Sequence, residues 1–63
     1  MNIERIIELR EKKGLSQAEL AEQIGVTRQA VNAYEKGTRQ PSPVVIVNIA
    51  KVLECTTDYI LGI

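Results

Sequence analysis

The chain has 63 residues, which is enough for one domain with a small hydrophobic core. Hydrophobic residues make up 44% of it and charged residues 25%, so the composition is that of a folded globular protein and excludes disorder as the default. Eight basic and eight acidic side chains cancel to a net charge of zero, histidine is absent and Cys55 is the single cysteine, which excludes an internal disulfide and a zinc site of histidine and cysteine ligands.

The first predicted helix covers residues 2–13, and Gly14 follows it as a left-handed stop. Its apolar face repeats at helical spacing and consists of Ile3, Ile6 and Ile7. Arg10 occupies the next position on the same face, where an apolar side chain is expected. A charge in that place needs a partner from another part of the chain.

The second predicted helix begins with a capping box. We expect the Ser16 hydroxyl to accept the backbone N–H of Glu19, and the Glu19 carboxylate to accept the backbone N–H of Ser16. Gly25 ends this helix after about two turns. Its inner face consists of Leu20, Ala21 and Ile24.

The third predicted helix follows after a turn of only three residues, Gly25, Val26 and Thr27. Thr27 caps the helix, which runs to about Lys36. Two short helices joined by a glycine-led turn of this length are the sequence outline of a helix-turn-helix. The inner side of the third helix consists of Ala30, Val31 and Tyr34. The outer side consists of Arg28, Gln29, Asn32, Ala33 and Lys36.

Glu35 interrupts the inner side of the third helix, as Arg10 interrupts that of the first. Opposite charges at two inward positions indicate one largely buried, hydrogen-bonded ion pair that joins the two helices, because either charge alone would carry a large desolvation penalty. The alternative is two ordinary surface charges at the edges of their helices.

The fourth predicted helix has Ser42 as its cap and Pro43 at its first position, and it runs to about Leu53. Its core face is expected to consist of Ile46, Ile49, Ala50 and Leu53. The helix carries more apolar side chains than one face needs, and this surplus is either a dimer surface or core covered by the following helix. The candidate dimer surface consists of Val44, Val45, Val47, Val52 and Ile63.

Thr56 or Thr57 caps a last short helix over residues 58–61, in which Asp58 lies near the positive end of the helix dipole. Cys55, just before it, is expected to be a small buried hydrophobe. Because no strand-like alternation of useful length occurs, the chain is predicted to be all-α, with five helices in one domain over residues 1–63.

The outer side of the third helix carries side chains that suit the base edges in the major groove of DNA. Arg28 can make a bidentate contact with guanine, and Gln29 and Asn32 can each do so with adenine. The methyl group of Ala33 suits a thymine methyl. The alternative is a solvated amphipathic helix, in which these residue types are also common.

Basic residues surround this outer side although the whole chain is neutral. Between residues 26 and 41 the basic residues are Arg28, Lys36 and Arg39, and the only acidic residue is Glu35. Such a local excess suits phosphate binding. Gln17, in the first turn of the second helix, is placed to reach a phosphate, with a solvated glutamine as the alternative.

The stretch from Leu9 to Gly37, followed by Pro41 and Ser42, resembles the Cro/repressor (XRE) helix-turn-helix family. The resemblance rests on a Ser-Gln-x-x-Leu-Ala core from Ser16, the Gly-Val-Thr turn from Gly25 and a Glu-Lys-Gly ending from Glu35. It implies a five-helix, lambda-repressor-like fold with the helix-turn-helix at the second and third helices. It also implies operator binding and the Arg10 to Glu35 pair.

The resemblance implies a role for individual residues as well. The residues that face the bases would be Arg28, Gln29, Asn32 and Ala33. The residues that contact the DNA backbone would be Gln17, Thr27, Lys36, Thr38 and Arg39. This chain departs from the family pattern at Glu54, where a glycine often follows the fourth helix, and at Pro43, where an apolar residue is usual.

We therefore expect a cytoplasmic transcriptional regulator, a repressor in the simplest case, that binds a pseudo-palindromic operator as a homodimer with half-sites about 10 bp apart or a multiple of this. The alternative is an antitoxin-like protein-binding module that also regulates its own gene. No enzyme, cofactor or metal is expected, because catalytic and ligand residues are missing. No membrane partner is expected, because no apolar run approaches the roughly 18 residues of a membrane span.

Overall fold

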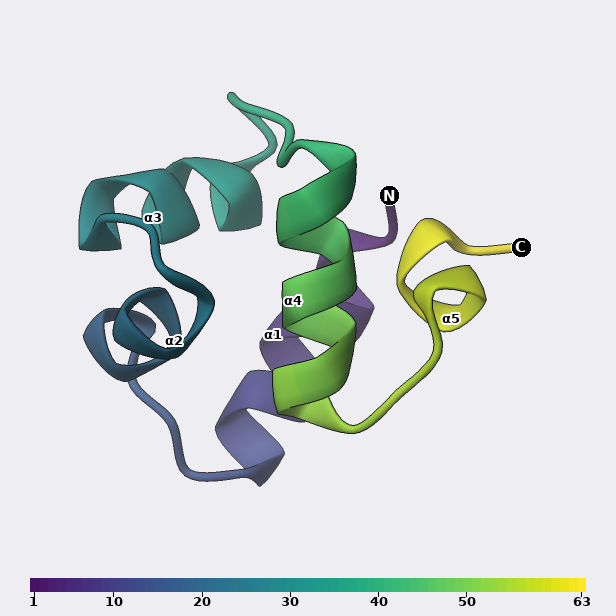
Figure 1. The fold of residues 1–63 in the computed structure, drawn as a ribbon, viewed down its shortest axis with the longest axis horizontal. Helices are drawn as coiled ribbons and strands as arrows, with labels where there is room; N and C mark the ends of the chain where they lie inside the picture. Colours follow the sequence, from purple (N-terminus) through teal and green to yellow (C-terminus); the bar gives the residue numbers. More distant parts are fainter.

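Five helices joined by short loops make up the computed structural model of residues 1–63 (Figure 1). In chain order they are α1 (Ile3–Lys12), α2 (Gln17–Ile24), α3 (Arg28–Lys36), α4 (Pro43–Leu53) and α5 (Thr57–Leu61). The predicted all-α class and the five helices are confirmed. Thr56 is the cap of α5 and Thr57 its first residue, which decides between the two threonines.

Each helix begins at a polar side chain that accepts a hydrogen bond from the backbone N–H three residues further along. These N-cap residues are Asn2, Ser16, Thr27, Ser42 and Thr56. The predicted capping box of α2 is complete, since Ser16 N–H donates to Glu19 Oε1 at 2.9 Å and Glu19 N–H donates to Ser16 Oγ at 3.0 Å. The caps define where each helix starts, so the short loops leave little freedom in the placement of successive helices.

The C-terminal end of α4 differs from those of its neighbours. Gly25 ends α2 with a φ of 75°, a left-handed conformation that glycine adopts without a steric penalty. Glu54 ends α4 with a φ of 56° and is the only residue other than glycine with a positive φ. A side chain with a Cβ is strained in this conformation. The conformation of Glu54 therefore lowers the stability of the protein locally, at the position where the family pattern favours glycine.

Every helix contributes to the core, and α4 lies at its centre. In Figure 1, α4 lies in front of α1, with α2 and α3 on one side and α5 on the other. The core side chains include Ile6, Leu20, Val31, Ile49 and Ile60, one from each helix, and none is more than 2% exposed. Because α4 packs against α1, α2 and α5, its buried surface is wider than one face.

This central position bears on the two alternatives left open for the surplus apolar residues of α4. Val45 and Val52, two members of the candidate dimer surface, are half-buried and pack against the core, which agrees with the alternative of a covered core. Ile46, expected on the core face, is only half-buried. The members of the candidate dimer surface that remain exposed are Val44 at 69%, Val47 at 41% and Ile63 at 86%.

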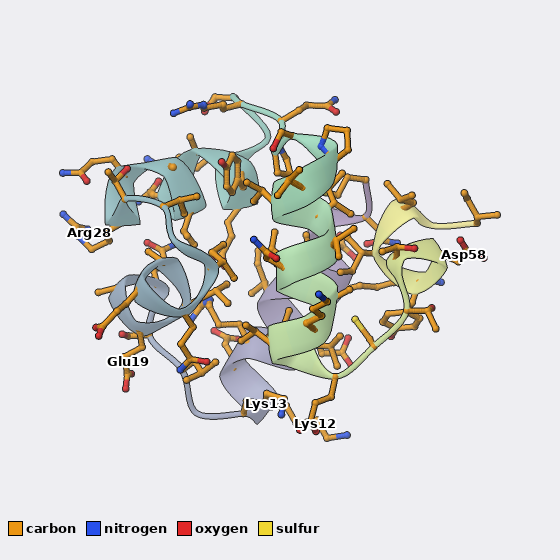
Figure 2. All side chains as sticks on the ribbon, in the orientation of Figure 1. Lys12, Lys13, Glu19, Arg28 and Asp58 are labelled. Atoms are coloured by element: carbon orange, nitrogen blue, oxygen red, sulfur yellow. The ribbon has the colours of Figure 1, made fainter.

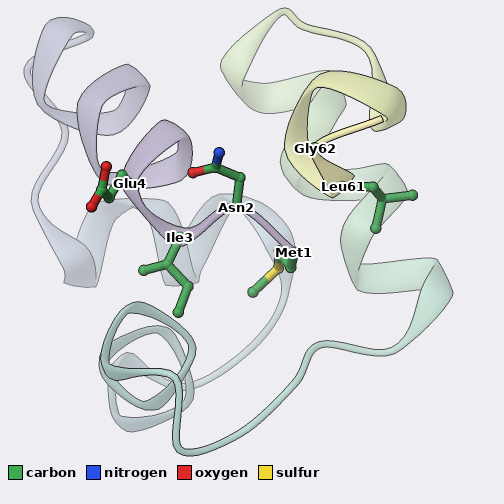
Figure 3. A pocket seen from close by; sticks show the side chains of 6 residues that line it. All are labelled: Met1, Asn2, Ile3, Glu4, Leu61 and Gly62. Atoms are coloured by element: carbon green, nitrogen blue, oxygen red, sulfur yellow. The ribbon is translucent and has the colours of Figure 1, made fainter.

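The two ends of the chain lie side by side (Figure 3). Asn2 N–H donates to the carbonyl oxygen of Ile60 at 2.6 Å. The Arg5 guanidinium lies 4.3 Å from the centre of the Tyr59 ring and donates to the Tyr59 carbonyl oxygen at 2.8 Å. A surface hollow of about 530 Å³ lies between these ends. Its lining residues are Met1, Asn2, Ile3, Glu4, Leu61 and Gly62.

Candidate nucleic-acid interface

The turn between α2 and α3 is held against the body of the protein. Val26 N–H donates to the Ala21 carbonyl oxygen at 3.0 Å, and the half-buried Val26 side chain packs against the core. Thr27 then caps α3, where its Oγ1 accepts from Ala30 N–H at 3.1 Å. With both ends of the turn anchored, α3 is presented at one angle relative to α2, as in a helix-turn-helix.

The inner side of α3 is buried as predicted. Ala30 and Tyr34 are each 5% exposed and Val31 is 1% exposed. The opposite side therefore faces outward, with Arg28 and Gln29 exposed and Asn32 and Ala33 half-buried. A surface hollow of about 430 Å³ runs along this outer side. Its lining residues are Arg28, Gln29, Asn32, Ala33, Lys36 and Thr38.

This hollow brings together all four residues expected to face DNA bases, and it adds two of those expected at the DNA backbone. Arg39, a third, is exposed in the loop between α3 and α4. Gln17 and Thr27 do not line the hollow. Thr38 lines it, but its hydroxyl donates to the Ala33 carbonyl oxygen at 3.4 Å, a long bond that a phosphate contact would have to replace.

The predicted pair of Arg10 and Glu35 is present and largely buried. Arg10 Nε donates to Glu35 Oε2 at 2.7 Å and Arg10 Nη2 donates to Glu35 Oε1 at 3.1 Å. The side chains are 12% and 6% exposed, so the two charges are largely removed from water. The hydrogen bond to Glu35 raises the pKa of Arg10, against the opposing effect of burial. Arg10 Nη1 also donates to the Leu15 carbonyl oxygen at 2.7 Å.

Sequence reasoning missed one member of this cluster. Gln17 Nε2 donates to Glu35 Oε1 at 2.9 Å, so the Gln17 side chain is half-buried and held by the protein. The alternative of a simply solvated glutamine is therefore wrong. No spacing rule connects Gln17 to Glu35, which lies 18 residues further along the chain. Glu35 thus accepts hydrogen bonds from both α1 and α2.

The charge at the start of α3 lowers the stability of that helix. Arg28 is the first residue of α3, and the first turn contains no acidic residue. A cation at this end is unfavourable, because the helix dipole is positive there. Figure 2 shows Arg28 at the start of α3 and Asp58 on the opposite side of the molecule. The arrangement presents positive charge on the outer side of α3 at a cost to the helix.

No group of three or more histidine, cysteine, aspartate or glutamate side chains is placed to hold a metal ion. Cys55 is half-buried rather than fully buried, and desolvation raises the pKa of its thiol, which lowers its reactivity at neutral pH. None of the five helices combines the length and the apolar character that crossing a lipid bilayer requires.

The chain is similar to several proteins that are named transcriptional regulators. The sequence profile of the helix-turn-helix family matches residues 6–60. The HTH-type transcriptional regulator YqaE of Bacillus subtilis is 38% identical over 58 residues, which are 92% of this chain and 50% of that protein. The HTH-type transcriptional regulator AnsR of the same organism is 36% identical over 62 residues, or 98% of this chain and 53% of that protein. The chain thus spans about half the length of both regulators.

A solved structure agrees with these sequence matches. The c2 repressor of phage P22, in complex with a synthetic operator, superimposes with a TM-score of 0.87 and 30% sequence identity. The match covers 94% of this chain and 91% of that one. The five-helix, lambda-repressor-like fold is therefore confirmed. The chain belongs to the helix-turn-helix family, and its resemblance to the Cro/repressor (XRE) group is confirmed.

Proposed function

We propose that this chain is the operator-binding domain of a transcriptional regulator, which binds double-stranded DNA at specific sequences with α3 in the major groove. The observation that carries the proposal is the hollow along the outer side of α3, which brings together the side chains suited to base edges, Arg28, Gln29, Asn32 and Ala33. Its relatives are named regulators, which supports the same function. They do not favour the antitoxin-like alternative, and the proposal includes no catalysis.

Each residue of this outer side has a proposed task. Arg28, Gln29 and Asn32 bind base edges, and the Ala33 methyl packs against a thymine methyl. Lys36 and Arg39 neutralise phosphates. Gln17 and the Thr27 and Thr38 hydroxyls are the remaining proposed backbone contacts, and these neutral groups position the domain along the duplex.

We further propose that two copies bind one pseudo-palindromic operator in the cytoplasm. One α3 reaches only a few base pairs, and two copies related by a two-fold axis would bind half-sites about 10 bp apart or a multiple of this. The exposed part of the candidate dimer surface supports this pairing. It consists of Val44, Val47 and Ile63.

The test is a selection of binding sites from randomised duplex DNA with the purified protein. We expect an enriched pseudo-palindrome. Arg28→Ala should relax one base position by roughly 1 to 3 kcal/mol, and Lys36→Ala should weaken all sequences alike and reduce the salt slope by about 1. Lys12→Ala is the matched control, because Lys12 lies at the far end of α1 from α3 (Figure 2). Selection of no motif even at low salt would contradict the proposal.

A further inference from the structure

We propose that Glu35 is a positioning residue for DNA binding, which holds the Gln17 side chain at the start of α2 so that its free amide N–H points to a phosphate. This inference rests on the function proposed above and assigns a task to a contact that the function alone does not need. Arg10, Gln17 and Glu35 form one hydrogen-bonded cluster, in which each side chain has a different role.

The hydrogen bonds of Glu35 leave one donor of Gln17 free. Its carboxylate accepts from Arg10 through both oxygens, and Oε1 also accepts from Gln17 Nε2 at 2.9 Å. The amide of Gln17 carries two N–H groups, and this is its one hydrogen bond within the protein. One N–H of Gln17 is therefore anchored and the other is left for a ligand.

Gln17 also lies at the end of α2 that attracts anions. Gln17 is the first residue of α2, where backbone N–H groups have no partner within the helix. The positive end of the helix dipole favours an anion at the same point. The Gln17 amide and the first turn of α2 thus both offer donors at this end of the helix, and we infer that they serve one acceptor, the DNA phosphate that the proposed function supplies.

The negative charge of Glu35 is compensated within the cluster. A lone carboxylate beside the DNA backbone would repel phosphates, but Arg10 neutralises Glu35, whose side chain is 6% exposed. The cluster therefore orients a neutral donor without adding negative charge to the binding surface. A glutamine that is ordered before DNA arrives loses less conformational entropy on binding than a free one.

A purely structural role for the contact is the competing explanation, and a double-mutant cycle on binding to the selected operator separates the two. The background Arg10→Met/Glu35→Met removes the ion pair as a unit, so that no charge is left buried alone. We expect Gln17→Ala to weaken binding about tenfold in the wild-type chain and about twofold in this background. The salt slope should not change, because a neutral amide releases no counterion.

Gln23→Ala is the matched control, since Gln23 is an exposed glutamine of the same helix, and it should leave affinity unchanged in both backgrounds. Equal losses for Gln17→Ala in both backgrounds would overturn the inference while leaving operator binding intact. If the wild-type chain binds no duplex at all, the proposed function fails and the inference fails with it.

A second measurement does not depend on any variant folding. Nitrogen-15 relaxation of side-chain amides in the free wild-type protein should show the Gln17 amide as rigid as the backbone of α2, and the Gln23 amide as mobile. A Gln17 amide as mobile as that of Gln23 would overturn the inference.

Discussion

Arg10 and Glu35 lie 25 residues apart in sequence, yet their side chains meet at 2.7 Å between α1 and α3. Both side chains are largely buried, so each charge depends on the other for compensation. Removal of one partner is therefore expected to cost far more than removal of both.

Arg10→Met should lower the free energy of unfolding by about 3 kcal/mol, because it leaves Glu35 buried without its counter-charge. The double variant Arg10→Met/Glu35→Met should recover most of this loss. Urea unfolding measures both values. Lys13→Met, which breaks the exposed pair with Glu54, should cost less than about 1 kcal/mol and serves as the control. A cost for Arg10→Met as small as that of the control would show that the pair behaves as two surface charges.

The capping box of α2 makes stability depend on pH. Hydrogen bonds from the backbone and side chain of Ser16 lower the pKa of Glu19 below its ordinary value of 4.5. Since the folded protein holds the charged form, the stabilisation is fully present above about pH 4.5 and is lost as the pH falls through the lower folded pKa.

Glu19→Gln should therefore reduce the loss of stability between pH 7 and pH 3, as measured by urea unfolding at both values. Glu22→Gln removes a carboxylate from the same helix without touching the cap and is the control for charge. An unchanged pH dependence in Glu19→Gln would mean that the box adds nothing to stability. At pH 7, Ser16→Ala should cost about 1 kcal/mol.

Glu54→Gly should stabilise the protein. The left-handed conformation of Glu54 is costly for a residue with a Cβ, and relief of this strain should exceed the extra chain entropy of glycine by about 0.5 kcal/mol. Thermal unfolding measures the change. Glu54→Ala is the matched variant, because it also removes the contact with Lys13 but keeps the strain, and it should not stabilise. A lower melting temperature for Glu54→Gly would contradict the strain argument.

Arg28→Glu should separate stability from function. A carboxylate at the first position of α3 suits the helix dipole, so the free energy of unfolding should rise by about 0.5 kcal/mol. Binding to the selected operator should be lost, because the same carboxylate repels phosphates and cannot donate to guanine. Lys36→Glu, at the other end of the helix, should lose both stability and binding. Retained binding by Arg28→Glu would remove Arg28 from the proposed site.

Val47→Glu tests the proposed dimer. Val47 is 41% exposed on α4, so a charge there should leave folding nearly unchanged but oppose pairing of two copies. Analytical ultracentrifugation on the operator should then show one copy bound in place of two. Lys51→Glu changes charge on the same helix and is the control. Cooperative binding of two Val47→Glu copies would exclude this surface from the interface.

Features set by local residues could be predicted from the sequence. Caps such as Ser16 and stops such as Gly25 act within a few residues of their own position, so the five helices followed from them. Arg10 and Glu35 could be paired across the chain because each interrupts an apolar stripe. The five residues of the outer side of α3 followed from the spacing of one helical face.

Features that depend on how the helices pack could not be predicted in this way. The bond from Gln17 to Glu35 joins two residues whose positions break no pattern, and only the angle between α2 and α3 brings them together. The sequence left open whether Val45 and Val52 lie on the surface or in the core, and only the packing of α4 against several helices decides that they pack against the core.

The side chains of Arg28, Gln29 and Asn32 make no hydrogen bond to the rest of the protein, although the helix that carries them is firmly packed through its other side. The proposed base contacts are thus separate from the side chains that pack the core. Under the proposed function, substitution at these positions would change the preferred DNA sequence while the core beneath stays the same, so one architecture could serve many unrelated genes.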